Sequence, residues 1–234
     1  MKIERVCGHS FSRDLLGNPA VVFDCGANHG EFSKWISENA NGIVHGFEPD
    51  PRLFPDLPSL SNTHFHHIAV SGTGDPLRLK LGEARDSSAY FSEKIEQESI
   101  VVESIKLDEF CRENSITRVD LIKLDVEGAE IEILTNLPEE FLRNIGQITV
   151  EFHDFIQKAD QPRIRNVISK LRNSGFFCVK FSHHDYSDVL CINTKIYSIV
   201  WWQILYIYIY YKVFQWLITS GAPKAEFLAA PKGH

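Results

Sequence analysis

Short apolar runs alternate along this chain with segments whose apolar residues have helical spacing. Five such runs have strand length, at residues 21–24, 43–48, 65–70, 119–125 and 147–152. Their continuous apolar character is typical of parallel strands that are buried on both faces. The pattern therefore predicts an α/β fold, a mostly parallel sheet with helices on both faces.

The segments between these runs predict the covering elements. Phe32, Trp35 and Ile36 share one helical face, and that helix should end near Asn41-Gly42. Phe54, Leu57 and Leu60 also have helical spacing. Two further helices are expected over residues 127–137 and 161–174. Leucines alternate with charges at 77–81, which predicts an antiparallel strand, and residues 176–181 with 189–193 predict a closing hairpin.

The length of 234 residues suits one globular domain. We divide the chain into a short N-terminal lead-in (1–19), a catalytic domain (20–194) and an aromatic C-terminal segment with its tail (195–234).

The C-terminal segment differs in composition from the rest of the chain. No charge lies between Lys195 and Lys212, and five of the seven tyrosines lie there. A helix of this stretch would be about 24 Å long, short of the roughly 30 Å hydrocarbon core of a membrane. The aromatic content favours a peripheral membrane contact or a protein interface through residues 196–218. The alternation from Leu205 to Tyr210 is also typical of a strand that pairs with another chain.

Charge and cysteine usage narrow the classes of partner. A formal net charge of -7 leaves no excess of basic residues for phosphates, so we expect no nucleic-acid partner. The five cysteines show neither zinc spacing nor a disulfide pattern, and the N-terminus lacks the pattern of a signal peptide. We therefore expect a cytoplasmic protein, with membrane association only through the C-terminal segment.

A glycine-containing turn follows the first predicted strand, with Asp24, Gly26, Asn28 and Gly30 in order. Glycine lets the backbone approach a ligand closely, and the helix N-terminus that follows favours a carboxylate. The spacing is not that of a dinucleotide-binding turn, which argues against an NAD-dependent oxidoreductase. Glu48 ends the next strand, where an acid can accept hydrogen bonds from ribose hydroxyls.

Further acidic residues follow two central strands. Asp125, Glu127 and Glu130 run from a strand end into a helix, although acids at a helix start also suit the helix dipole. Glu151 and His153 alternate at the end of the next strand and should point to the same side. We expect Asp125 and His153 as candidate bases and the other three as active-site acids. A divalent cation that bridges Asp125 and a substrate diol is an alternative, although no spacing demands a metal ion.

Four motifs together, VVFDCGANHGEFS, HGFEPDP, SIKLDEFCREN and VDLIKLDVEGAEIEIL, resemble the FkbM family of methyltransferases over residues 21–153. The resemblance implies a Rossmann-like, seven-stranded methyltransferase sheet, S-adenosylmethionine as cofactor and an acceptor hydroxyl on a sugar or secondary metabolite. It implies that Asp24, Gly26, Asn28 and Gly30 form the methionine-side loop and that Glu48 holds the ribose. It also implies that Ala69 lies near the adenine and Ser87-Ser88 near the active site.

The functional hypothesis is methyl transfer to the hydroxyl of a small-molecule acceptor. A non-catalytic protein is the alternative, a scaffold that binds S-adenosylmethionine or attaches to a membrane through its aromatic segment. Such a scaffold would bind the methyl donor without turnover.

Overall fold

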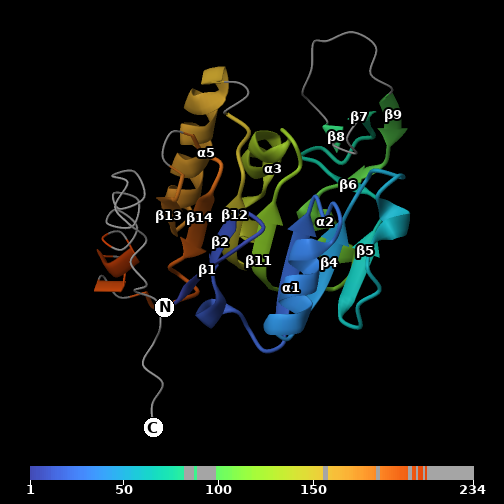
Figure 1. The fold of residues 1–234 in the computed structure, drawn as a ribbon. Coiled ribbons are helices and arrows are strands. Elements are labelled where there is room, and N and C mark those ends of the chain that lie inside the picture. The colour runs from blue at the N-terminus through green and yellow to red at the C-terminus, as the bar shows by residue number, and fades with distance from the viewer. Residues whose placement is uncertain are drawn as a thin grey trace, which may run out of the picture. The chain divides into compact units, whose positions relative to one another are not determined.

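The computed structural model describes residues 1–81, 87–88, 99–154, 158–182, 185–199, 202–203, 205–207 and 209. The chain divides into two units, Met1–Ser198 and Ile199–His234. The first unit contains all the numbered helices and strands (Figure 1).

A seven-stranded sheet forms the centre of the first unit. Its strand order is β13-β14-β12-β11-β3-β4-β5, and β14 runs antiparallel to both of its neighbours while the other pairs are parallel. The sheet is therefore the Rossmann-like, mostly parallel sheet of seven strands with a closing antiparallel hairpin that the sequence predicts. The strands span Ala20–Cys25 (β3), Gly42–Phe47 (β4), Thr63–His66 (β5), Val119–Leu124 (β11), Ile145–Val150 (β12), Phe176–Lys180 (β13) and Val189–Asn193 (β14).

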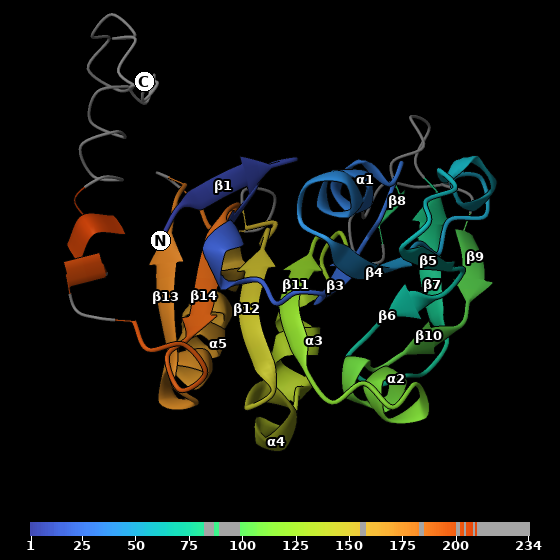
Figure 2. The same ribbon diagram turned by 90° about the horizontal axis from the view of Figure 1, so that it is seen from below.

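Helices cover both faces of this sheet. Figure 2 shows α1 on one face and α2, α3 and α5 on the other. The helices span Glu31–Asn39 (α1), Leu107–Glu113 (α2), Glu130–Asn136 (α3), Glu139–Leu142 (α4) and Gln161–Asn173 (α5), with 3-10 turns at Arg13–Leu15 (η1), Phe54–Asp56 (η2) and Lys158–Asp160 (η3). Between these layers every residue of β11 and β12 is buried. Each fully buried aliphatic side chain there contributes roughly 1.5–3 kcal/mol of hydrophobic stabilisation.

Two predicted elements are shorter than their apolar patterns indicated. The helix expected from residue 127 begins at Glu130 (α3), because Glu127 and Gly128 have left-handed φ angles of 55° and 112°. The helical spacing of Phe54, Leu57 and Leu60 yields only the 3-10 turn η2, in a stretch that prolines interrupt.

The single strand predicted at residues 65–70 is wrong, because the chain changes sheets there. It pairs first as β5 and then as β6 (Ala69–Val70), which lies parallel to β10 (Ser104–Ile105). This change of partner brings Ala69 to the pocket described below.

The alternating leucines form the predicted antiparallel strand. β7 (Leu77–Leu81) pairs with β9 (Ser99–Val102) and with β8 (Ser87–Ser88). Leu79 and Leu81 are buried while Arg78 is exposed, which is the expected effect of a two-residue period.

The N-terminal lead-in folds as a hairpin of β1 (Ile3–Val6) and β2 (His9–Ser12). Ser10 donates to Asp188 from both its backbone nitrogen (3.0 Å) and its hydroxyl (2.7 Å). Gln147 accepts from the Ser12 nitrogen at 2.8 Å and donates to the Ser12 carbonyl at 3.0 Å. These buried bonds fix β2 over β12 and β14 and thereby hold His9 in place.

The second unit corresponds to most of the aromatic segment. Its residues 202–203, 205–207 and 209 are helical, so the strand interpretation is wrong for these positions. Within the part of the chain that the structure describes, no helix has the length and apolar character needed to cross a membrane. The remainder of the segment lies outside the described residues, and its contact with a membrane or a protein stays a prediction.

Candidate functional site

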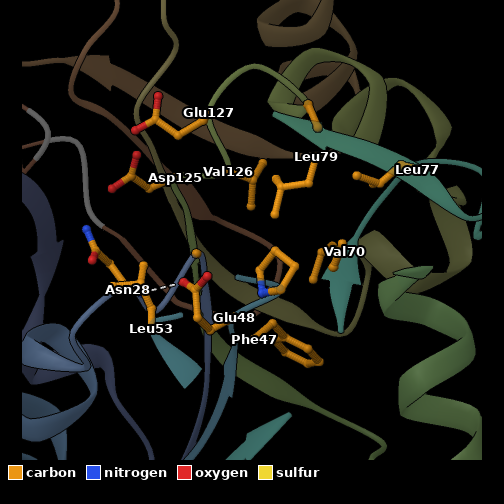
Figure 3. Close-up of a pocket in the computed structure, with 14 residues that line it drawn as sticks. Asn28, Phe47, Glu48, Leu53, Val70, Leu77, Leu79, Asp125, Val126 and Glu127 are labelled. Carbon is orange, nitrogen blue, oxygen red and sulfur yellow. Dashed lines mark hydrogen bonds between the residues drawn. The ribbon is translucent and has the colours of Figure 1, made fainter. Parts of the chain in front are cut away.

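The carboxyl ends of β3, β4, β11 and β12 meet at one edge of the sheet, where a pocket opens. Figure 3 shows the carboxylates of Asp125 and Glu127 near each other at one end and Leu77, Leu79 and Val70 at the other. The lining comprises Gly26, Asn28, Phe47, Glu48, Pro49, Leu53, Ala69, Val70, Leu77, Leu79, Asp125, Val126, Glu127 and Ala129. One elongated space therefore joins an apolar slot to an acidic mouth, at the place where open α/β sheets bind ligands.

Gly26 is the tightest point of the first turn. Its φ is +80°, and a Cβ atom there would lie 1.8 Å from the Asp125 carbonyl oxygen. Its backbone N–H donates to the Phe47 carbonyl at 3.0 Å. The turn thus needs glycine both for its left-handed conformation and for its contact with the chain after β11.

Gly30 begins α1 with a φ of +75°, and a Cβ atom there would lie 2.7 Å from Pro58. The close contact that requires glycine here is with Pro58, in the segment after η2. Gly30 does not line the pocket. Of the four predicted loop residues, Gly26 and Asn28 line the pocket, whereas Gly30 and Asp24 support it from behind.

Asp24 is fully buried beneath the turn. Its carboxylate accepts hydrogen bonds from the Ser33 nitrogen at 3.1 Å and the Ser33 hydroxyl at 2.7 Å, and its other oxygen lies 3.2 Å from Lys123 Nζ. These contacts tie β3, α1 and β11 together.

Lys123 is a buried ammonium at the centre of the site. Nζ lies 3.2 Å from Asp24 Oδ1 and 3.5 Å from Asp125 Oδ2, and it donates to the Gly26 carbonyl at 2.6 Å. Burial alone would lower the pKa of this lysine, but the two carboxylates outweigh burial and raise it. The sequence analysis gave Lys123 no role, although a lysine in an otherwise apolar buried strand needs a partner.

Glu48 follows β4 and lies in the pocket wall, where only 5% of it is exposed. Its two carboxylate oxygens accept the backbone N–H groups of Asn28 (2.7 Å) and Asp50 (2.8 Å). Burial raises the pKa of Glu48 to about 7, against the lowering effect of these two hydrogen bonds. The predicted ribose acid thus stands at the pocket with lone pairs left for further donors.

Ala69 lies in the apolar slot with Phe47, Leu53 and Val70, as the adenine assignment requires. A flat heteroaromatic ring fits such a slot because it buries apolar area on both faces. Ser87 and Ser88 form β8 beside β7, and their side chains lie outside the described residues.

The acidic mouth is built around Asp125. Its Oδ2 atom lies 3.3 Å from His9 Nε2, and its Oδ1 atom lies 3.8 Å from His153 Nε2. Burial alone would raise the pKa of Asp125, but Lys123 and the His9 hydrogen bond hold it well below its usual range.

His153 is clamped between two acids. Its Nε2 atom lies 3.1 Å from Glu127, and its Nδ1 atom lies 3.1 Å from Glu130. Burial would lower the pKa of His153, yet the two carboxylates raise it to about 11. With both ring nitrogens facing carboxylates, the geometry suits an imidazolium that positions its neighbours more than a base that accepts a proton.

Glu130 and Glu151 differ sharply in their contacts. The Glu130 carboxylate is buried and accepts the backbone N–H groups of Val126 (3.0 Å) and Gly128 (3.1 Å). The Glu151 carboxylate has no hydrogen bond or ion pair with the residues that the structure describes. Burial, and then the nearby Asp125, raise the pKa of Glu151 to about 7.

His9 is, after Lys123, a second site residue that sequence reasoning missed. It lies 116 residues from Asp125 in the chain, and its side chain has no exposed area. Its ring packs edge-on against Phe32 of α1. The sequence around His9 does not indicate that its side chain reaches the site. Its position depends on the hydrogen bonds between β2 and residues far along the chain.

A family model described as the Methyltransferase FkbM domain matches residues 24–178. The chain is 27% identical over 180 residues to the hexuronic acid methyltransferase AglP of Haloferax volcanii, covering 70% of this chain and 72% of that protein. It is 28% identical over 204 residues to the 2-O-methyltransferase NoeI of Sinorhizobium fredii, covering 78% of this chain and 83% of that one.

Among solved structures, the fibrillarin of Aeropyrum pernix with natively bound S-adenosyl-L-methionine superposes with a TM-score of 0.42 at 16% sequence identity. The superposition covers 76% of this chain and 66% of that one.

Proposed function

Because this chain belongs to the FkbM family of methyltransferases, we propose that its acceptor is a hydroxyl group of a sugar or secondary metabolite. The chain is an S-adenosylmethionine-dependent O-methyltransferase. The observation that carries the proposal is the continuity of the apolar slot and Glu48 with the acidic mouth around Asp125. The mouth offers carboxylates, which accept hydrogen bonds from several hydroxyls of one acceptor.

The residues present fit S-adenosylmethionine. We assign the apolar slot with Ala69 to the adenine, Glu48 to the ribose hydroxyls, and the backbone around Gly26 and Asn28 to the methionine part. When bound, the cofactor supplies a methyl group on a positively charged sulfur, and S-adenosylhomocysteine is left after transfer.

The protein's own contribution is alignment and proton acceptance. The acceptor hydroxyl would lie at the mouth beside Asp125 and Glu127, and its proton would pass to a carboxylate oxygen of this cluster as the new C–O bond forms. His153, held by Glu127 and Glu130, would keep these acids in place. The names of both relatives, a hexuronic acid methyltransferase and a 2-O-methyltransferase, support a sugar-like acceptor.

The test is methylation of a panel of neutral sugars, glycosides and polyketide alcohols, read by mass spectrometry as the gain of one methyl group. We expect Asp125→Asn to lower kcat by about 100-fold or more, while the Kd for S-adenosylhomocysteine changes little. Asp108→Asn in α2 is the matched control. No methylation of any hydroxylated acceptor by a protein that binds S-adenosylhomocysteine would contradict the proposal.

Glu48 should make cofactor binding depend on pH. An ionised carboxylate is the stronger acceptor for ribose hydroxyls, and the pKa of Glu48 is about 7. Affinity for S-adenosylhomocysteine should therefore weaken as the pH falls through about 7. Calorimetric titration at several pH values checks this, with Glu48→Gln expected to bind more weakly and without the pH dependence. The same pH profile in that variant would assign the titration to another group.

A further inference from the structure

Three side chains beside the pocket form a cluster of nitrogen and oxygen ligands. His9 comes from β2, Asp125 follows β11 and Glu151 follows β12. One ligand atom from each lies within 4.8 Å of the others. Trans ligands of a six-coordinate divalent ion are separated by roughly 4–5 Å and cis ligands by about 3 Å, so the three atoms could share one ion with small adjustments.

The cluster leaves potential ligand atoms unused. His9 is fully buried, and its Nδ1 atom has no hydrogen-bond partner. The Glu151 carboxylate makes no hydrogen bond or ion pair with described residues, as noted above. A buried polar atom without a partner costs about 1–3 kcal/mol. Glu151 thus places a carboxylate that is unpaired among the described residues beside Asp125, while the other ring nitrogen of His9, Nε2, lies 3.3 Å from an Asp125 oxygen.

The local charge also favours a cation. Asp24, Asp125, Glu127, Glu130 and Glu151 are five carboxylates grouped around the ammonium of Lys123 and the imidazole of His153. Lys123 is shared between Asp24 and Asp125, and His153 is taken up by Glu127 and Glu130. His153 also lowers the pKa of Glu151, but the five carboxylates outnumber the two cations of the cluster.

We propose that His9, Asp125 and Glu151 bind a divalent cation with mixed nitrogen and oxygen preference, of the Mn²⁺ class. A second trio, Asp125, Glu127 and His153, also brings its ligand atoms within 4.8 Å of one another. In that trio both imidazole nitrogens lie 3.1 Å from carboxylate oxygens of Glu127 and Glu130. We therefore favour the trio with His9, whose Glu151 carboxylate is unpaired among the described residues.

The proposed cation specifies how the acceptor binds, and this part rests on the proposed function. Three protein ligands leave positions for oxygens of the substrate, and adjacent hydroxyls of a sugar-like acceptor suit them. A bound hydroxyl loses its proton more readily, so its transfer to a carboxylate oxygen of the cluster becomes easier. The methyl carbon of the donor would then bond to the deprotonated hydroxyl oxygen of the acceptor, while the electron pair of the broken C–S bond stays on sulfur.

Binding can be measured without donor or acceptor, by titrating the protein with Mn²⁺ and following the electron paramagnetic resonance signal of the free ion. We expect one strong site per chain. Glu151→Gln and His9→Gln should each weaken it by about tenfold or more. The matched controls Glu139→Gln in α4 and His64→Gln in β5 change exposed residues and should leave it unchanged.

Glu151→Gln removes no hydrogen bond that the described residues make, so it should fold even if the buried His9 variant does not. Binding of S-adenosylhomocysteine checks the fold of each variant. Absence of a strong Mn²⁺ site in the wild-type protein, or equal affinity in Glu151→Gln, overturns the site. Methylation without any Mn²⁺ site would leave the proposed function standing, whereas Mn²⁺ binding without methylation of any acceptor would leave only the metal site standing.

Discussion

Replacing Lys123 by methionine should lower the free energy of unfolding by about 3–5 kcal/mol, the usual cost of removing one partner from a buried ion pair. The substitution keeps the volume of the stem but leaves the Asp24 carboxylate fully buried without its counter-charge. It also removes the hydrogen bond to the Gly26 carbonyl. Urea denaturation with an unchanged m-value would measure the loss.

Lys34→Met is the matched control for this experiment. Lys34 is exposed on α1 and should change stability by less than about 0.5 kcal/mol. Equal stability of the two variants would show that the ammonium does not balance the buried acids. Loss of S-adenosylhomocysteine binding in the Lys123 variant, at temperatures where it is still folded, would also show that Lys123 positions the glycine turn.

Gly26→Ala should weaken S-adenosylhomocysteine binding by about 100-fold or more, since even a displacement of about 1 Å in a site can cost this much. The alanine Cβ would lie 1.8 Å from the Asp125 carbonyl oxygen, and real Cβ atoms do not approach that closely. The turn must therefore move away from β11, and with it the backbone that faces the ligand. Calorimetric titration would give the Kd.

Gly74→Ala is the control that separates the effect of backbone strain from the effect of a steric clash at the added Cβ atom. Gly74 has a φ of +79°, nearly that of Gly26, but the nearest atom to its added Cβ is at 3.4 Å. This variant carries the same left-handed penalty, about 1–2 kcal/mol, without displacing the pocket. If both variants bind the ligand as well as the wild-type protein, the Gly26 turn is not part of the cofactor site.

The central sheet was predictable because the parallel strands bury both faces. A short, largely apolar run such as β11 is typical of a parallel strand that is buried on both faces. Because parallel strands end at the same edge of a sheet, the residues that follow these runs are expected there. Gly26, Glu48 and Asp125 were therefore placed at one edge from sequence alone.

Other features depend on partners that the local pattern does not contain. β2 consists of His9, Ser10, Phe11 and Ser12, all buried, which no apolar or alternating pattern indicates. The backbone nitrogens of Ser10 and Ser12 and the Ser10 hydroxyl donate to Asp188 and Gln147, far along the chain. The left-handed conformation of Glu127 could not be predicted from the sequence either, because a non-glycine residue adopts it only when its surroundings require it.

The roles of the histidine and the acids also depend on contacts with residues outside their own segments. The sequence predicted His153 as a candidate base, but Glu127, after β11, and Glu130, at the start of α3, make it a positively charged support. Glu130 is occupied by backbone N–H groups, while Glu151 keeps its lone pairs. Acids that lie in the same site thus have different roles, and only their contacts distinguish these roles.

The hairpin that carries His9 also has a consequence for the order of events during synthesis. Ser10 and its partner Asp188 are separated by 178 residues, which a ribosome adds in roughly 9–36 s at about 5–20 residues per second. During that interval Asp188, one of the two buried side chains that finally hold β2, is missing. The mouth of the site should consequently be among the last regions to reach its native contacts, after the sheet that supports it has formed.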